Sequence, residues 1–113
     1  MSNPDLVQYI VEQAGGAGEV RARKMFGDYC LYCNDKPVGL ICDDMLYLKP
    51  LKQLEPVIIR HLQEYAAGAA APVPDMHPPY DGAKPHYRIA DIDDRDYISL
   101  LVRTVHDNLK TNK

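Results

Sequence analysis

Two short polar breaks divide an apolar stretch that runs from Arg23 to Lys49, and this spacing constrains the fold more than any other feature. The breaks are Asn34-Asp35-Lys36 and Asp43-Asp44. The residues around them are rich in Tyr, Leu, Val, Ile and Cys, which favour strands, and polar breaks of this length are typical of hairpin turns. The sequence therefore predicts three antiparallel strands, at Arg23–Cys33, Pro37–Cys42 and Met45–Lys49.

Helical periodicity flanks these strands on both sides. In Pro4–Ala14 apolar residues recur at intervals of three and four, and Pro4 suits a first helical turn. Leu54–Tyr65 has the same periodicity. So does a final segment that follows Asp91, Asp93 and Asp94, whose carboxylates suit the start of a helix. Three helices are therefore expected.

A proline-rich segment lies between the second and third helices. Its prolines exclude a central strand but tolerate an edge strand, so Met76–Tyr80 and Pro85–Ile89 are predicted to form a short edge hairpin with a turn at Asp81-Gly82. A polyproline II docking segment is the alternative for this region. The expected order is helix, three strands, helix, two strands and helix. This order describes a two-layer α+β fold, with helices packed on one face of an antiparallel sheet.

Length and composition narrow the class of protein. With 113 residues, 46% hydrophobic and 26% charged, the chain is expected to form one domain over residues 1–113 with a core of its own. No apolar run is long enough to span a membrane, and three cysteines do not suggest a disulfide framework, so a cytoplasmic protein is expected. The net charge of -3 argues against direct binding of nucleic acid. The alternative, phosphate contacts from Arg21, Arg23 and Lys24, is less favoured than a solvated strand.

Cys30 and Cys33 have the C-x-x-C spacing of redox pairs and zinc sites. Residues three apart in a strand point to opposite faces, so these two thiols are expected to be small buried groups without shared chemistry. With a turn over Asn34–Pro37, Cys33 should lie opposite Val38, Leu31 opposite Leu40 and Tyr29 opposite Cys42. This register would place Cys33 and Cys42 on one face, about three pairs apart.

Both faces of the predicted sheet carry apolar side chains, although a free sheet usually has one polar face. Either a loop or a second subunit is therefore expected to cover the second face, and a protein partner or a homodimer is predicted there. The residues assigned to the first face are Tyr29, Leu31, Val38, Leu40, Cys42, Met45 and Tyr47. The residues assigned to the second face, the candidate interface, are Cys30, Tyr32, Ile41, Leu46 and Leu48.

No arrangement of side chains in the sequence spells out a reaction, so no catalytic residue, metal or cofactor is predicted. His77, Tyr80, His86 and Tyr87 could line a pocket for a small molecule or for catalysis. Tyr and His also commonly edge a core with their polar ends in water, and this second interpretation is favoured.

The stretch identified first resembles the TfoX/Sxy N-terminal domain family, through Leu31-Tyr32, the Asn34-Asp35-Lys36 turn and two longer runs. The residues of these runs are Arg23, Lys24, Met25, Phe26, Gly27, Asp28 and Tyr29, then Asp43, Asp44, Met45, Leu46, Tyr47, Leu48 and Lys49. The resemblance implies an α-β(3)-α-β(2)-α fold similar to secretion-chaperone-like proteins, and a link to regulators of natural competence. It implies no catalytic residues.

Two positions depart from the family pattern, with Cys30 and Lys36 where the family tends to have Gly. Full-length competence regulators carry a second, helical domain, so this chain is expected to be a stand-alone member. Its expected role is that of a non-catalytic interaction domain in regulation.

Overall fold

Four strands, not three, separate the first two helices. The computed structural model describes residues 2–25, 27–65 and 73–109. In chain order the elements are α1 (Pro4–Gln13), the 3-10 turn η1 (Gly15–Ala17), β1 (Val20–Met25), β2 (Asp28–Cys33), β3 (Lys36–Cys42), β4 (Met45–Leu48), α2 (Leu54–Tyr65), β5 (Met76–His77), β6 (His86–Ile89) and α3 (Arg95–Asn108). The α+β class and the placement of helices against the sheet are confirmed, whereas the predicted order lacked one strand.

The predicted first strand, Arg23–Cys33, is in fact the second half of β1 and the whole of β2. The chain reverses near Gly27, whose φ of +83° lies in the left-handed region that Gly adopts without a side-chain clash. The strand β1 has the sequence VRARKM, and its charges hide the apolar alternation by which a strand is recognised. It lies at the edge of the sheet, where charged side chains oppose pairing with other chains.

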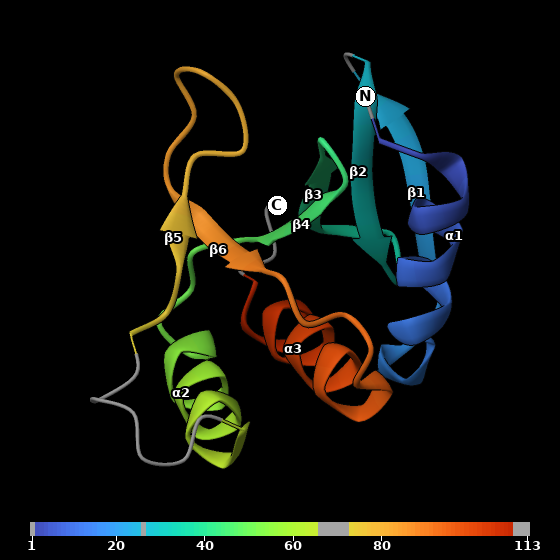
Figure 1. Ribbon diagram of the computed structural model, residues 1–113. Coiled ribbons are helices and arrows are strands. Elements are labelled where there is room, and N and C mark those ends of the chain that lie inside the picture. The colour runs from blue at the N-terminus through green and yellow to red at the C-terminus, as the bar shows by residue number, and fades with distance from the viewer. Residues whose placement is uncertain (1, 26, 66–72, 110–113) are drawn as a thin grey trace.

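The six strands form one sheet in the order β1-β2-β3-β4-β6-β5, and every neighbouring pair is antiparallel (Figure 1). The two polar breaks are two-residue turns. Asn34 and Asp35 have φ values of 49° and 68°, and Asp43 and Asp44 have 50° and 62°, as tight hairpins require. The predicted edge hairpin is confirmed, although β5 ends at His77, before two prolines.

The predicted register between β2 and β3 is wrong. Cys33 lies opposite Lys36, Leu31 opposite Gly39 and Tyr29 opposite Ile41. The turn is shorter than expected, and a bulge near Leu31 and Tyr32 adds one residue to β3. One extra residue moves every following side chain to the other face.

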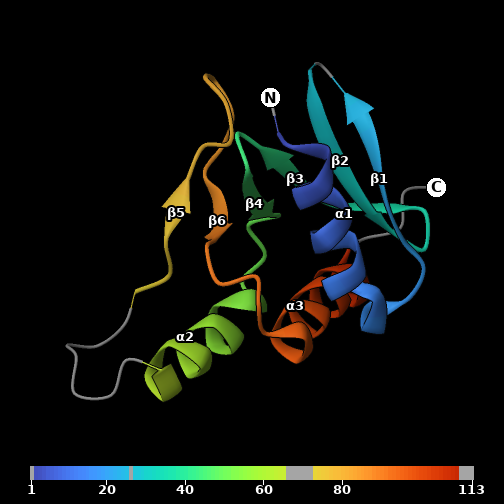
Figure 2. The same cartoon turned by 45° about the vertical axis from the view of Figure 1, so that its right-hand side comes forward.

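The helices begin at polar caps and pack on one face of the sheet. The Asn3 side chain accepts a hydrogen bond from Asp5 N at 2.8 Å, and Asp94 accepts one from Tyr97 N at 3.1 Å. Figure 2 shows the helices gathered on one side of the strands. The core between these layers includes Val7, Ile10, Leu31, Cys33, Val38, Ile41, Leu46, Leu48, Leu54, Ile58, Tyr87, Ile89, Ile98, Leu101, Val102 and Val105. Within the described residues, no helix has the length and apolar character to cross a membrane.

Candidate functional site

The face of the sheet opposite the helices carries a continuous row of paired side chains across five strands. The register pairs Arg23 with Cys30, Cys30 with Leu40, Leu40 with Tyr47, and Tyr47 with Arg88. Because these residues alternate along their strands with those of the core, they share the helix-free face. We call this face the open face; it also includes Arg21, Met25, Asp28, Tyr32, Cys42 and Met45.

The predicted interface is divided between the two faces. Cys30 and Tyr32 lie on the open face, and they share one face of the sheet as predicted. Ile41, Leu46 and Leu48 are 0% exposed and belong to the core beneath the helices. The prediction failed because the bulge in the β2–β3 pair reverses the alternation from Gly39 onward.

The row on the open face is apolar in the middle and has an arginine at each end, Arg23 at one and Arg88 at the other. Cys30 and Tyr47 are only 5% and 6% exposed, and Leu40 is half-buried between them. The Arg88 guanidinium donates a hydrogen bond to Asp75 at 2.7 Å, which raises the pKa of Arg88. The ring of Tyr47 stacks on His77 with centroids 6.4 Å apart. Asp75 and His77 therefore pack against the end of the row formed by Arg88 and Tyr47, and Leu40 lies at the centre of the row.

A pocket of about 700 Å³ opens at one end of the open face. Its apolar lining comes from Met25, Leu40 and Cys42 on the sheet and from Pro79 and Tyr80 in the loop between β5 and β6. The remaining lining residues are Tyr29, Asp28, Asp43 and Asp81. The sheet and a loop about forty residues away in sequence therefore build this pocket together.

Asp28 holds the wall of this pocket in place. Its two carboxylate oxygens accept hydrogen bonds from Ser2 N at 3.1 Å and from Asp43 N at 3.0 Å. The Asp44 carboxylate accepts another from Asn3 N at 2.6 Å. The turn at Asp43-Asp44 was predicted, but its connection to the start of α1 was not, because no sequence signal links residues so far apart.

The three cysteines are free and buried. Cys33 faces the core, where its Sγ lies 3.7 Å from Ala17 O, whereas Cys30 faces the other way, so the predicted separation of the C-x-x-C pair is confirmed. Cys42 shares the open face with Cys30 and not, as predicted, a face with Cys33. Burial, with a smaller effect of the charges of Asp28 and Asp43, raises the pKa of Cys42 to about 11, so the thiol is protonated at neutral pH.

The four residues proposed as a pocket do not converge. Tyr80 is 60% exposed and lines the pocket on the open face, whereas Tyr87 is 6% exposed within the core. His77 stacks on Tyr47, and Nδ1 of His86 donates to Lys84 O at 2.8 Å. The geometry therefore does not support chemistry that needs these four side chains together.

A second pocket, of about 460 Å³, lies between α2 and α3 beside the buried His61. Nε2 of His61 donates to Asp91 at 2.7 Å, and its ring stacks on Tyr97 with centroids 3.5 Å apart. Among the described residues that line this pocket there is no Ser, Thr or Cys, and burial raises the pKa of Tyr97 to about 12. The hydrogen bond and the ring stacking of His61 connect α2 to α3 and to the segment before it, as a structural contact does.

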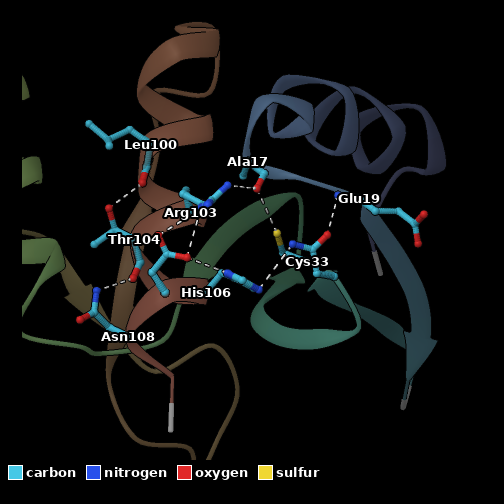
Figure 3. A network of polar contacts seen from close by, with 10 residues as sticks. Ala17, Glu19, Cys33, Leu100, Arg103, Thr104, His106 and Asn108 are labelled. Atoms are coloured by element: carbon cyan, nitrogen blue, oxygen red, sulfur yellow. Dashed lines mark hydrogen bonds and ion pairs between the residues drawn. The ribbon is translucent and has the colours of Figure 1, made fainter. Parts of the chain in front are cut away.

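A polar network at the C-terminal end of α3 fastens three segments together (Figure 3). Arg103 donates to Ala17 O at 3.3 Å and to the Asp107 carboxylate at 3.0 Å. His106 hydrogen bonds to Asp107 and lies 3.5 Å from Asn34, whose Oδ1 accepts from Glu19 N. Hydrogen bonds from His106 and then Arg103 lower the pKa of Asp107. The network links α3, η1 and the β2–β3 turn, which is a structural role.

The residues that resemble the family are spread over both faces and two turns. Leu46 and Leu48 lie in the core, Tyr47 lies on the open face, and Gly27, Asp43 and Asp44 form turns. Phe26 lies outside the described residues. The structure places Arg23, Lys24 and Met25 in β1, Tyr29 in β2 and Lys49 just after β4. In the described part of the chain, no group of three or more His, Cys, Asp or Glu side chains could hold a metal ion.

Comparison with known proteins finds one family whose model covers most of the chain. The family model described as TfoX N-terminal domain matches residues 12–103. An uncharacterized 12.7 kDa protein in the trpE 5′ region of Spirochaeta aurantia is 33% identical over 84 residues. That alignment covers 74% of this chain and 62% of the relative, so the chain spans less than two thirds of that protein.

Proposed function

The chain belongs to the TfoX N-terminal domain family, and from this premise we propose that it is a non-catalytic domain that binds a partner polypeptide on the open face of its sheet. The observation that carries the proposal is the row Cys30–Leu40–Tyr47. It is apolar, crosses three adjacent strands and lies on the face opposite the one on which the described helices pack.

The form of the open face supports a polypeptide ligand in particular. Leu40, half-buried at the centre of the row, is the apolar side chain of the row that a ligand can contact directly, because Cys30 and Tyr47 beside it are 5% and 6% exposed. The two ends of the row, at Arg23 and Arg88, present charged groups at the rim, as protein interfaces do. The two arginines on this face that have ion-pair partners, Arg21 with Asp35 and Arg88 with Asp75, are already neutralised, which disfavours phosphate binding.

We propose further that the domain acts in the cytoplasm as one unit over residues 1–113, in the regulation of competence or transcription. Membership of the family is the support for the regulatory role. A second copy of the chain is the alternative occupant of the open face, because the same apolar row could pair with itself in a homodimer.

Site-specific photo-crosslinking tests the proposal. A benzophenone side chain is placed at Tyr32, which is half-buried on the open face, and the purified protein is irradiated in lysate from the source organism. The matched control carries the same group at Leu100, which is 53% exposed on α3. We expect one discrete adduct from position 32, with the partner identified by mass spectrometry, and no such adduct from position 100.

The adduct mass separates the two occupants. A product of twice the chain mass, together with a dimer in analytical ultracentrifugation at micromolar concentration, would assign the open face to a second copy. Adducts of equal yield and identity from both positions, or none from position 32, would overturn the proposal.

A further inference from the structure

The pocket beside Leu40 continues the apolar row of the open face into a hollow with two walls. One wall is the end of the sheet, at Met25, Leu40 and Cys42. The other is the β5–β6 loop, where Pro79 is buried and Tyr80 is 60% exposed. Figure 2 shows this loop rising next to the end of the β3–β4 hairpin. Leu40 belongs both to the row and to the pocket, so a segment lying along the row reaches the hollow directly.

The charged side chains among the described lining residues of the pocket are all acidic. Its lining includes the carboxylates of Asp28, Asp43 and Asp81, and none of the lining residues that the structure describes is Lys, Arg or His. The two backbone hydrogen bonds to Asp28 fix its carboxylate within the wall, so its position does not depend on a ligand. The charges of Asp28 and Asp43 reach the inside of the pocket, because they add to the effect of burial in raising the pKa of Cys42, and the charge of the N-terminal amino group offsets only part of this rise.

The combination of apolar walls and acidic groups selects an organic cation. Carboxylates in the described chain do not converge for a metal ion, and an apolar floor cannot supply the oxygen ligands that a hard cation needs. An arginine side chain matches both features. Its guanidinium is weakly hydrated, donates to carboxylates through a planar fork and stacks on aromatic rings such as that of Tyr80. Its three-carbon stem can lie against apolar walls.

We propose that this pocket receives an arginine side chain of the partner polypeptide that lies along the open face. The inference rests on the proposed function and deepens it, since it names the chemistry of one anchor in the partner. The volume of about 700 Å³ falls in the ordinary range for ligand pockets and accommodates one such side chain with its flanking backbone.

The test uses the peptide acetyl-Gly-Arg-Gly-amide as probe, followed by ¹H–¹⁵N NMR of the purified full chain. We expect saturable shifts that are concentrated at the amides of Leu40–Asp44 and of Tyr80–Gly82. The lysine peptide should bind several-fold more weakly, and the citrulline peptide, which has the same shape without the charge, should produce no saturable shift. Raising the salt concentration should weaken binding of the arginine peptide.

Two variants locate the site. Asp81→Asn and Tyr80→Ala should each raise the Kd about fivefold or more, because one removes an exposed carboxylate of the lining and the other removes the stacking ring. Glu12→Gln on α1 makes the same change in net charge as Asp81→Asn outside the pocket and should leave the Kd unchanged. Equal binding of the citrulline peptide, or equal weakening by Glu12→Gln, would overturn the inference.

The outcomes also separate this inference from the proposed function. Crosslinking at position 32 without binding of the arginine peptide would reject the arginine anchor and keep the open face. Binding of the arginine peptide in the pocket without an adduct at position 32 would reject the docking of a polypeptide on the open face, and with it the partner assigned to the pocket.

Discussion

Gly39 lies where strands β3 and β4 leave no room for a side chain. A Cβ at this position would lie 2.3 Å from Tyr47 O and 3.0 Å from Leu48 Cδ2. A Cβ at this position would force the paired backbone of β4 to shift, which costs hydrogen-bond and packing energy. We therefore predict that Gly39→Ala lowers the free energy of unfolding by about 3 kcal/mol, measured by urea denaturation.

The matched control for this change is Gly15→Ala, because a Cβ there meets nothing within 4 Å. That variant should change the stability by less than about 0.5 kcal/mol. Equal stability of the two variants would contradict the close approach at Gly39. If Gly39→Ala aggregates, its loss of folded structure is measured at low protein concentration instead.

Single residues differ in how much the sequence reveals about them. The opposite orientation of Cys30 and Cys33 follows from strand alternation, which is a local rule, and it was predicted correctly. Asp28 was not singled out for its role in the pocket wall. Its partners Ser2 and Asp43 lie 26 and 15 residues away, and only the folded chain brings their N–H groups to one carboxylate.

Helix α2 is fastened to α3 by the contact of His61 with Tyr97 and Asp91. The stacked rings and the 2.7 Å hydrogen bond of His61 are both lost in His61→Ala. We predict a loss of about 1–3 kcal/mol in stability, and faster hydrogen exchange across Leu54–Tyr65 than in the strands, measured by mass spectrometry.

Gln63→Ala is the control for the helix, because Gln63 is exposed on the same element. It should leave the exchange of α2 within error of the unmodified protein. If His61→Ala increased exchange in β2 and β3 as much as in α2, the contact would support the whole core and not this helix in particular.

Elements with local signals were predicted well, and those set by pairing were not. The bounds of α2 match the prediction at both ends, and those of α1 differ by one residue. The signals that define a helix, its periodicity and the Pro or Gly residues at its ends, lie within or next to the helix in the sequence. The strand β1 was merged with β2, since its charges hide any alternation. The extra residue in β3 depends on how two strands pair, which no single strand encodes.

For the whole molecule, the correct class and the wrong face assignment have one common origin. Helical stripes and hairpin spacing determine an antiparallel sheet with helices on one side, whatever the register. The face on which Ile41, Leu46 and Leu48 point depends on the register alone, so one extra residue exchanged them with Leu40 and Tyr47. The sequence therefore predicted a second apolar face, but three of the residues assigned to that face, Ile41, Leu46 and Leu48, belong to the core.

Two buried groups predict how the stability of the whole protein depends on alkaline pH. Burial raises the pKa of Cys42 from 9.0 to about 11 and that of Tyr97 from 10.0 to about 12, with nearby aspartates adding to both shifts. Each group holds its proton more tightly in the folded state than in the unfolded state. Their contribution is therefore complete below pH 9 and is lost as the pH rises toward 12.

We predict that the melting temperature falls steeply between pH 9 and pH 12, with a loss of about 1–3 kcal/mol from each group. In the double variant Cys42→Ala and Tyr97→Phe neither side chain can ionise, so the fall over this range should be shallower, although its stability at pH 7 is lower. Other groups with raised pKa, among them Cys30, Cys33 and Tyr87, remain and preserve part of the slope. A fall as steep as that of the unmodified protein would show that these two protons do not control the alkaline transition.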